Sequence, residues 1–179
     1  MNPPDTAMGA AGARPAAHPA PAFAPALAFE DVAVGQEAGP MHKGPFTTAH
    51  LMRWSAAMEN WHKIHYDLPF ATGHDKLPGL LINGSLKQQL IAQLLKDWAG
   101  PTGWVWKVRF QFRAMNLAGE RLAIWAKITG TERKAAYGLV ELELGIRNDA
   151  GMESTPGSAT VALPFRGGPP LPYPFVPPT

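Results

Sequence analysis

Residues 48–60 have the apolar periodicity of an amphipathic helix. Thr48 stands where an N-cap is expected, which predicts a helix from Thr48 to about Asn60. The positions expected to share its inner face are Leu51, Trp54, Ser55 and Met58.

A second helical period follows in NGSLKQQLIAQLLKDWAG. Asn83 or Ser85 is a plausible N-cap, and Gly100-Pro101 is a clear stop. The apolar face is broad, so we expect this helix to be largely buried. Its members are Leu86, Leu90, Ile91, Leu94, Leu95 and Trp98.

In the second half of the chain the period changes to the two-residue alternation of strands. Four successive segments show it: residues 104–112, 122–128, 140–147 and 159–165. Turns containing Gly and Asp separate the segments, which implies an antiparallel sheet. Their alternation is expected to point Trp104, Trp106 and Trp125 inward, toward the core or a second subunit.

A strongly apolar helix that precedes such a sheet is best buried when the sheet curves around it. The pattern therefore predicts an α+β domain, an antiparallel sheet wrapped around a long central helix. Residues 28–165 form this single domain, with no internal repeat and no linker. Residues 1–27 are rich in Ala and Pro and predict a disordered arm, and the Pro-rich residues 166–179 predict an extended tail.

Composition narrows the class of protein. The formal charge of +2 is too mild for a nucleic-acid partner, and no apolar run is long enough for a membrane span. The chain has no cysteine, which excludes disulfides, thiolate metal sites and a cysteine nucleophile. With no secretory signal at the N-terminus, a cytoplasmic location is the default expectation.

The run NWHKIHYD, residues 60–67, concentrates polar side chains that could do chemistry. His62 and His65 are three residues apart and with Asp67 could ligate a metal, although no further ligand cluster accompanies them. Alternatively, one histidine acts as a general acid or base, because its ordinary pKa lies near neutrality. The third possibility is structural: His62 packs at a helix end, and Asp67 accepts hydrogen bonds from loop N–H groups.

This run and the buried helix after it resemble the MaoC-like acyl-CoA dehydratases and hydratases, which have the hotdog fold. The general family has an aspartate followed five residues later by a histidine, where this chain has Asn60 and His65. The mesaconyl-CoA hydratase-type branch is more similar: an asparagine, then His-Arg-Ile-His-Tyr-Asp, with Lys63 replacing the arginine here. LPGLLINGSL is similar to that branch's PGLVVHGPL, and VRFQFRAMNLAGERL resembles the family's strand-turn-strand. The resemblance covers residues 28–165.

The resemblance implies which residues form the site. His65 takes the place of the family's catalytic histidine, and Asn60 stands where most members carry aspartate. Gly84, at the start of the buried helix, takes the place that binds the thioester oxygen, and its missing side chain lets a substrate approach closely. Asn83 replaces the branch's histidine and can still hydrogen-bond an acyl group, and Asp67 is a further substrate-binding candidate.

The implied activity is addition or removal of water at an enoyl- or 3-hydroxyacyl-CoA thioester, with coenzyme A as part of the substrate and no metal or redox cofactor. A homodimer, a higher homo-oligomer or a heteromer with a second hotdog subunit is expected, because a single sheet leaves an exposed edge. Two alternatives remain open. One is a non-catalytic hotdog subunit, which Asn60 and Asn83 favour. The other is a hotdog acyl-CoA thioesterase, for which Glu59, Asp67 or Asp75 would have to supply a carboxylate.

Overall fold

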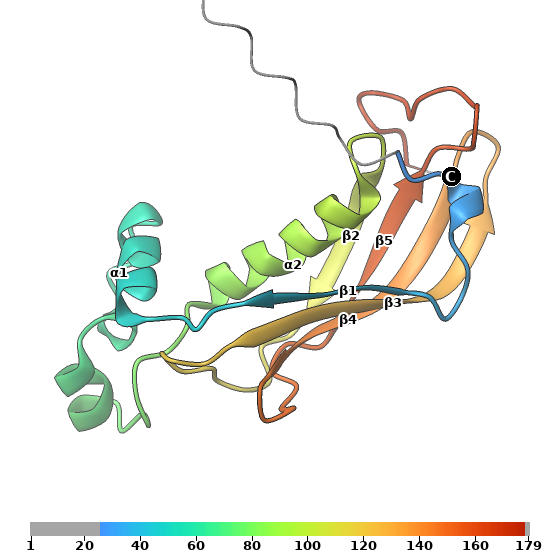
Figure 1. The fold of residues 1–179 in the computed structure, drawn as a ribbon. Coiled ribbons are helices and arrows are strands. Elements are labelled where there is room, and N and C mark those ends of the chain that lie inside the picture. The colour runs from blue at the N-terminus through green and yellow to red at the C-terminus, as the bar shows by residue number, and fades with distance from the viewer. Residues whose placement is uncertain (1–25, 178–179) are drawn as a thin grey trace, which may run out of the picture.

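The computed structural model describes residues 26–177 of the chain (Figure 1). Two helices, three short helical turns and five strands follow one another. Their order is η1 (Phe29–Asp31), β1 (Glu37–Lys43), α1 (Thr48–Ala57), η2 (Lys63–His65), η3 (Phe70–His74), α2 (Gly84–Ala99), β2 (Trp104–Phe110), β3 (Leu122–Arg133), β4 (Gly138–Asn148) and β5 (Gly157–Leu163).

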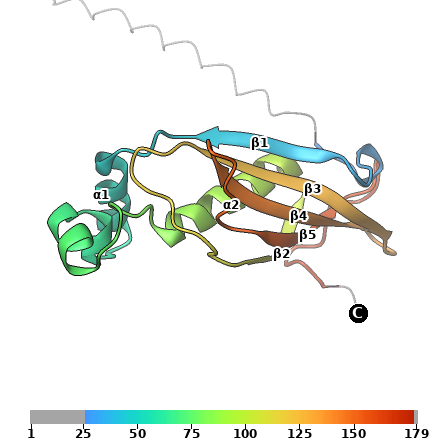
Figure 2. The same ribbon diagram turned by 90° about the horizontal axis from the view of Figure 1, so that it is seen from below.

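The strands form one antiparallel sheet in the order β1-β3-β4-β5-β2. Helix α2 lies along one face of this sheet (Figures 1 and 2) and contacts β3, β4 and both edge strands, β1 and β2. The predicted α+β architecture, a long helix enclosed by an antiparallel sheet, is therefore confirmed.

The core lies between α2 and the sheet. The predicted apolar face of α2 is buried from Leu86 to Leu95, and Trp98 is half-buried against the same cluster. The alternation predicted for β3, β4 and β5 is also confirmed, because the expected inward residues within these strands are at most 2% exposed. They are Leu122, Ile124, Ala126, Ile128, Val140, Leu142, Leu144, Ile146, Ala159, Val161 and Leu163. Phe165, expected in the same set, lies beyond the end of β5 and is half-buried.

Both ends of α2 match the sequence signals. Asn83 is the N-cap residue, and Gly100 follows the helix with a φ of 68°, a left-handed conformation that glycine adopts without strain. The helix has 16 residues, and no helix within residues 26–177 is long and apolar enough to cross a membrane.

Helix α1 is shorter than predicted. Its N-cap is Thr47 rather than Thr48, and the Thr47 N–H donates to His50 Nδ1 at 3.1 Å. The helix ends at Ala57, three residues before Asn60, and Met58 is 52% exposed instead of facing the core. Helical periodicity continues past the true end, so it misplaced the boundary.

The sheet has five strands rather than four, because β1 carries no sequence signal of alternation. Ala38 is the one buried residue of β1, and its pairing with β3 is irregular between Ala38 and Met41, where Gly39-Pro40 interrupts the strand. An edge strand with few inward side chains and an internal proline gives no period to detect.

The inward placement of the tryptophans is wrong. The pairing of β2 with β5 shifts between Val105 and Lys107, and this irregularity reverses which side chains face the helix. Val105 packs against the main core, whereas Trp104 is 41% exposed and Trp106 joins a separate cluster with Tyr137. Trp125 alternates with the inward Ile124 and donates its indole N–H to Glu153.

Residues 108–122 connect two successive strands, as the resemblance to a strand-turn-strand implies, but these strands are not neighbours in the sheet. Strands β2 and β3 do not pair; β2 lies at one edge of the sheet, and β3 is next to the opposite edge. The connecting loop instead passes the start of α2, where Ile82 N–H donates to Asn116 O at 2.8 Å.

The terminal segments are described in part. Residues 1–25 of the predicted disordered arm, and residues 178–179 of the tail, lie outside the described residues. Leu27, assigned to the arm from sequence, packs against the core. In the tail, Phe175 packs on Trp104, Trp106 and Tyr137.

Candidate functional site

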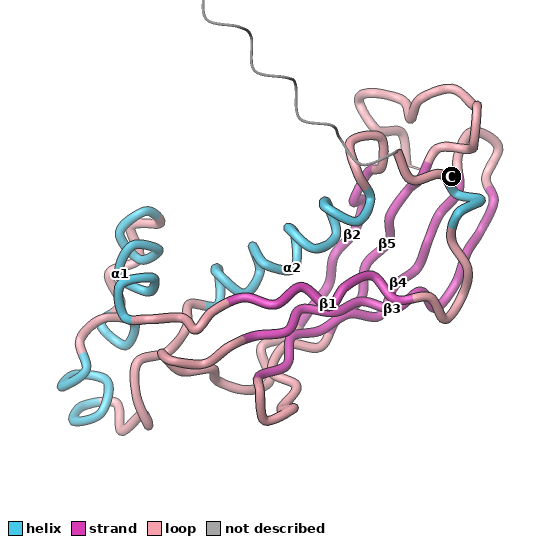
Figure 3. Tube along the Cα trace, viewed as in Figure 1, coloured by secondary structure: helices cyan, strands magenta, loops and turns pink. Residues whose placement is uncertain are grey.

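The predicted site residues lie beside the N-terminal end of α2. The segment between α1 and α2 contains η2 and η3 and projects past that end of the helix (Figure 3). Leu81 N–H donates to Ile64 O at 3.0 Å, which joins the turn containing His65 to the residues that lead into Asn83 and Gly84.

His65 is held in a defined orientation. It is 7% exposed, and its Nδ1 lies 2.9 Å from Leu81 O. A carbonyl oxygen can only accept a hydrogen bond, so Nδ1 must carry the proton. In the neutral ring Nε2 then bears the lone pair and is the basic atom.

Burial also favours the neutral ring. It lowers the pKa of His65 below its ordinary value of 6.5, and His62 lowers it further, while the bond to Leu81 opposes the shift. At neutral pH, His65 is therefore a base with an available nitrogen rather than a cation.

Asn83 is fully buried and only partly satisfied. Its Nδ2 donates to Ser55 Oγ at 3.1 Å, whereas Oδ1 has no partner among residues 26–177. If the amide were turned over, Ser55 would donate to Oδ1 and Nδ2 would be left without a partner. One end of this buried amide is open in either orientation, which typically marks a place for a water or ligand.

Helix α1 fixes the start of α2 through two side-chain contacts. Besides the Ser55–Asn83 bond, Trp54 Nε1 donates to Ser85 Oγ at 2.9 Å. Ser85 is therefore not a cap but an attachment point. The first N–H groups of α2, beginning with Gly84, have no acceptor within the helix and favour negative charge.

The missing side chain of Gly84 leaves room for the ring of Phe112. A Cβ at Gly84 would meet two carbons of the Phe112 ring at 3.0 Å. The Cβ side of Gly84 is therefore covered by an aromatic ring, and the close approach of a substrate to its N–H stays a prediction.

The other predicted residues lie in the turn around His65. Asn60 Oδ1 accepts the His62 N–H at 3.3 Å, and Asn60 is half-buried. Asp67 Oδ1 accepts the Phe70 N–H at 3.0 Å, and the carboxylate lies 3.9 Å from the Lys63 ammonium. Asp67 thus acts as the loop acceptor described by the structural alternative.

The metal alternative finds little support in these contacts. The rings of His62 and His65 are 6.2 Å apart at a steep angle, and Nδ1 of His65 is bound to Leu81. Within residues 26–177 no group of three His, Asp or Glu side chains is arranged to hold an ion.

Sequence reasoning missed Lys87. It is 3% exposed, and its Nζ donates to Ala114 O and to Asn116 Oδ1, each at 3.1 Å. Lys87 precedes Ile91 by four residues and Leu94 by seven, so it interrupts the apolar stripe of α2. A lysine at such a position was the available signal.

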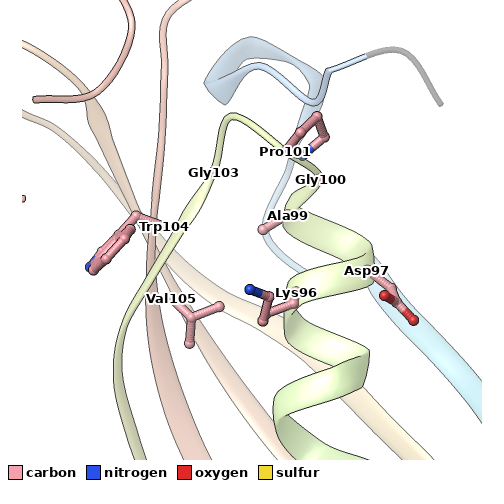
Figure 4. Close-up of a pocket in the computed structure, with 8 residues that line it drawn as sticks. All are labelled: Lys96, Asp97, Ala99, Gly100, Pro101, Gly103, Trp104 and Val105. Carbon is pink, nitrogen blue, oxygen red and sulfur yellow. The ribbon is translucent and has the colours of Figure 1, made fainter. Parts of the chain in front are cut away.

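A cavity of about 570 Å³ opens at the other end of α2 (Figure 4). Lys96, Gly100 and Trp104 are among its lining residues, and Gly84 and His65 are not. Sixteen helical residues span about 24 Å, so this cavity is remote from the N-terminal turn.

The sequence matches a family model at the residues that form this site. The model describes hydroxyacyl-thioester dehydratase type 2 and matches residues 29–120, half of the chain. The chain belongs to this family. The matched region contains α1, the turn with His65, and all of α2.

One curated relative is a mesaconyl-C(4)-CoA hydratase from Chloroflexus aurantiacus, 41% identical over 72 residues. The match covers 40% of this chain and 26% of the relative, so the chain spans only about a quarter of that protein's length.

Solved structures confirm the hotdog fold. The (R)-hydratase from A. caviae involved in PHA biosynthesis has a TM-score of 0.67 and 22% identity, covering 75% of this chain and 99% of that one. A MaoC-like dehydratase from Rhodospirillum rubrum has a TM-score of 0.68 at 17% identity, covering 78% and 98%. The ChsH1-ChsH2 complex from Mycobacterium tuberculosis has a TM-score of 0.64 at 14% identity, covering 73% and 98%.

Proposed function

We propose that the protein adds water to, or removes water from, an enoyl- or 3-hydroxyacyl-CoA thioester, with His65 as its acid and base. The observation that carries this proposal is the His65–Leu81 contact, because it leaves Nε2 as a free base on a buried, neutral ring. The family to which the chain belongs points to the same chemistry.

In the hydration direction, Nε2 of His65 takes a proton from water while the water oxygen bonds to C3 of the enoyl group. The electrons of the C2–C3 double bond move toward the carbonyl, and negative charge develops on the thioester oxygen. The protonated His65 then returns its proton to C2. Dehydration is the reverse, and neither direction changes the oxidation state overall.

The N-terminal turn of α2 would hold the thioester oxygen. The Gly84 N–H and the helix dipole both stabilise negative charge there. We assign the open end of the buried Asn83 amide to an acyl or water group, and Asn60 to orienting the water. Asparagine does not exchange protons at physiological pH, so His65 would serve both proton transfers.

Contacts of two of the three candidate carboxylates, Asp67 and Asp75, disfavour the thioesterase alternative. Asp67 is engaged by the Phe70 N–H, and Asp75 accepts from the exposed His74 at 2.7 Å. The non-catalytic subunit alternative has two supports: Asn60 stands in place of an ionisable carboxylate, and Asn83 in place of the branch's histidine.

We also propose that the open sheet pairs with a second hotdog, either another copy or a different subunit. Strands β1 and β2 are its edges, and unpaired edges favour association. Light scattering on a sizing column, for the protein alone, would separate a homodimer from a chain that needs a different partner.

The test of the activity is hydration of crotonyl-CoA, followed by loss of enoyl absorbance, with thiol release measured in parallel. His65→Ala should lower turnover by about 10²–10⁴-fold, while His74→Ala, which removes an exposed histidine, should not. Unchanged turnover in His65→Ala would refute the assignment, and thiol release in place of hydration would favour the thioesterase.

A further inference from the structure

Lys87 is a buried cation in the first part of α2. Side chains on a helix point back toward its N-terminus, so the Lys87 side chain covers the turn that contains Gly84. Its Nζ reaches the loop after β2, where Ala114 O and Asn116 Oδ1 accept its hydrogen bonds.

This is an unfavourable place for a positive charge. The start of a helix repels cations, and both acceptors of Lys87 are neutral. The carboxylate that acts on it, Glu120, is reached only through Asn116, whose Nδ2 donates to Glu120 Oε2 at 2.9 Å. Burial lowers the pKa of Lys87 to about 8, which still leaves the ammonium charged at neutral pH.

Phe112 links this charge to the proposed oxygen-binding turn. Its ring centre lies 5.1 Å from Lys87 Nζ, and its ring carbons lie 3.0 Å from the Cβ position of Gly84. The ring therefore contacts both residues, and Lys87 itself is only 3% exposed, so water has little access to its charge. A charge that is screened poorly acts more strongly on its surroundings.

We propose that Lys87 is a positioning residue of the site: its ammonium adds to the positive end of α2 and stabilises the negative charge that develops on the thioester oxygen at the Gly84 N–H. This rests on the proposed function. Lys87 need not touch the substrate, because its electric field acts across the first turn of the helix. The ammonium is costly to bury beside the positive end of α2, and the same positive potential stabilises an anionic oxygen there.

The kinetic test compares Lys87→Met with the wild-type protein and with Lys127→Met, which removes an exposed lysine from β3. The oxygen gains its charge only in the transition state, so kcat for crotonyl-CoA should fall by about ten- to a hundredfold with little change in KM. Lys127→Met should behave as wild type. A Lys87→Met protein that folds and retains wild-type kcat would overturn the proposal.

A spectroscopic test does not depend on turnover. Acetoacetyl-CoA forms an enolate with its own ultraviolet absorption, and a site that stabilises anionic oxygen increases this absorption when the compound binds. The enolate absorption of bound acetoacetyl-CoA should be stronger with the wild-type protein than with Lys87→Met. Should that variant fail to fold, Lys87→Gln keeps a donor for the Asn116 and Ala114 oxygens without the charge.

The outcomes separate the two proposals. A Lys87-dependent enolate band without crotonyl-CoA turnover would reject the hydratase function and keep the role of Lys87 in stabilising an anion. Turnover together with an enolate band that is the same in wild type and a folded Lys87→Gln would keep the hydratase function and reject the role of Lys87.

Discussion

Replacing Lys87 by methionine should change how the stability of the protein depends on pH. In the folded protein the pKa of Lys87 is lowered to about 8, from an ordinary value of 10.5. Below pH 8 the lysine is protonated in the folded and the unfolded chain, and the penalty of burying its charge is fully present. Between pH 8 and pH 10.5 the folded chain loses this proton first, so the free energy of unfolding rises with pH.

The size of the effect follows from the shift. Each pKa unit is worth about 1.4 kcal/mol, so the whole shift corresponds to roughly 3 kcal/mol of unfolding free energy. Methionine cannot titrate, and the remaining ionisable groups are the same in both proteins. Between pH 8 and pH 10.5, the free energy of unfolding of the wild-type protein should therefore rise relative to that of Lys87→Met by about 1.4 kcal/mol for each pH unit.

Urea unfolding at pH 7, 8, 9 and 10, followed by tryptophan fluorescence, measures this difference directly. Lys127→Met is the matched control, and its difference from wild type should be nearly constant. If the difference in unfolding free energy between wild type and Lys87→Met also stayed constant with pH, it would refute the argument that burying this charge near Glu120 and the start of α2 costs free energy.

Three further predictions concern the same elements. Gly84→Ala should lower the free energy of unfolding by about 1 kcal/mol or less, because the new methyl group would meet the Phe112 ring at 3.0 Å and that ring is half exposed and can shift. In a Phe112→Ala background, Gly84→Ala should no longer lower the free energy of unfolding. Leu95→Ala, at a fully buried position of α2, should lower the unfolding free energy by about 2–5 kcal/mol in a urea titration, against about 0.5 kcal/mol or less for the exposed Lys96→Ala. In the acidic range, kcat/KM for crotonyl-CoA should fall with a midpoint below 6.5, because protonation of His65 removes the base; a midpoint above 6.5 would contradict its lowered pKa.

The parts of the fold predicted from sequence are those with a regular period. The buried faces of α2, β3, β4 and β5 follow directly from apolar residues at helical or strand spacing. Strand β1 was missed because an edge strand broken by Pro40 buries almost nothing. The tryptophans of β2 were placed on the wrong side because an irregularity between Val105 and Lys107 reverses the alternation, and no local pattern announces it.

The candidate site, too, was predictable from the sequence only in part. The motif resemblance identified His65 and Gly84, and the structure brings their segments together through Ile64 and Leu81. The partner of the imidazole was not predictable, because it is a backbone carbonyl 16 residues away. The cover that Phe112 forms over Gly84 depends on a loop whose path the strand pattern does not encode.

The central claim is that His65 is a neutral base whose available nitrogen is Nε2. Proton–nitrogen NMR of the imidazole rings, with His65→Ala to assign the signals, reports both the tautomer and the pKa of this ring. The account predicts a proton on Nδ1, none on Nε2, and a pKa below 6.5 that matches the acidic midpoint of kcat/KM. A ring protonated on Nε2 at neutral pH would contradict it.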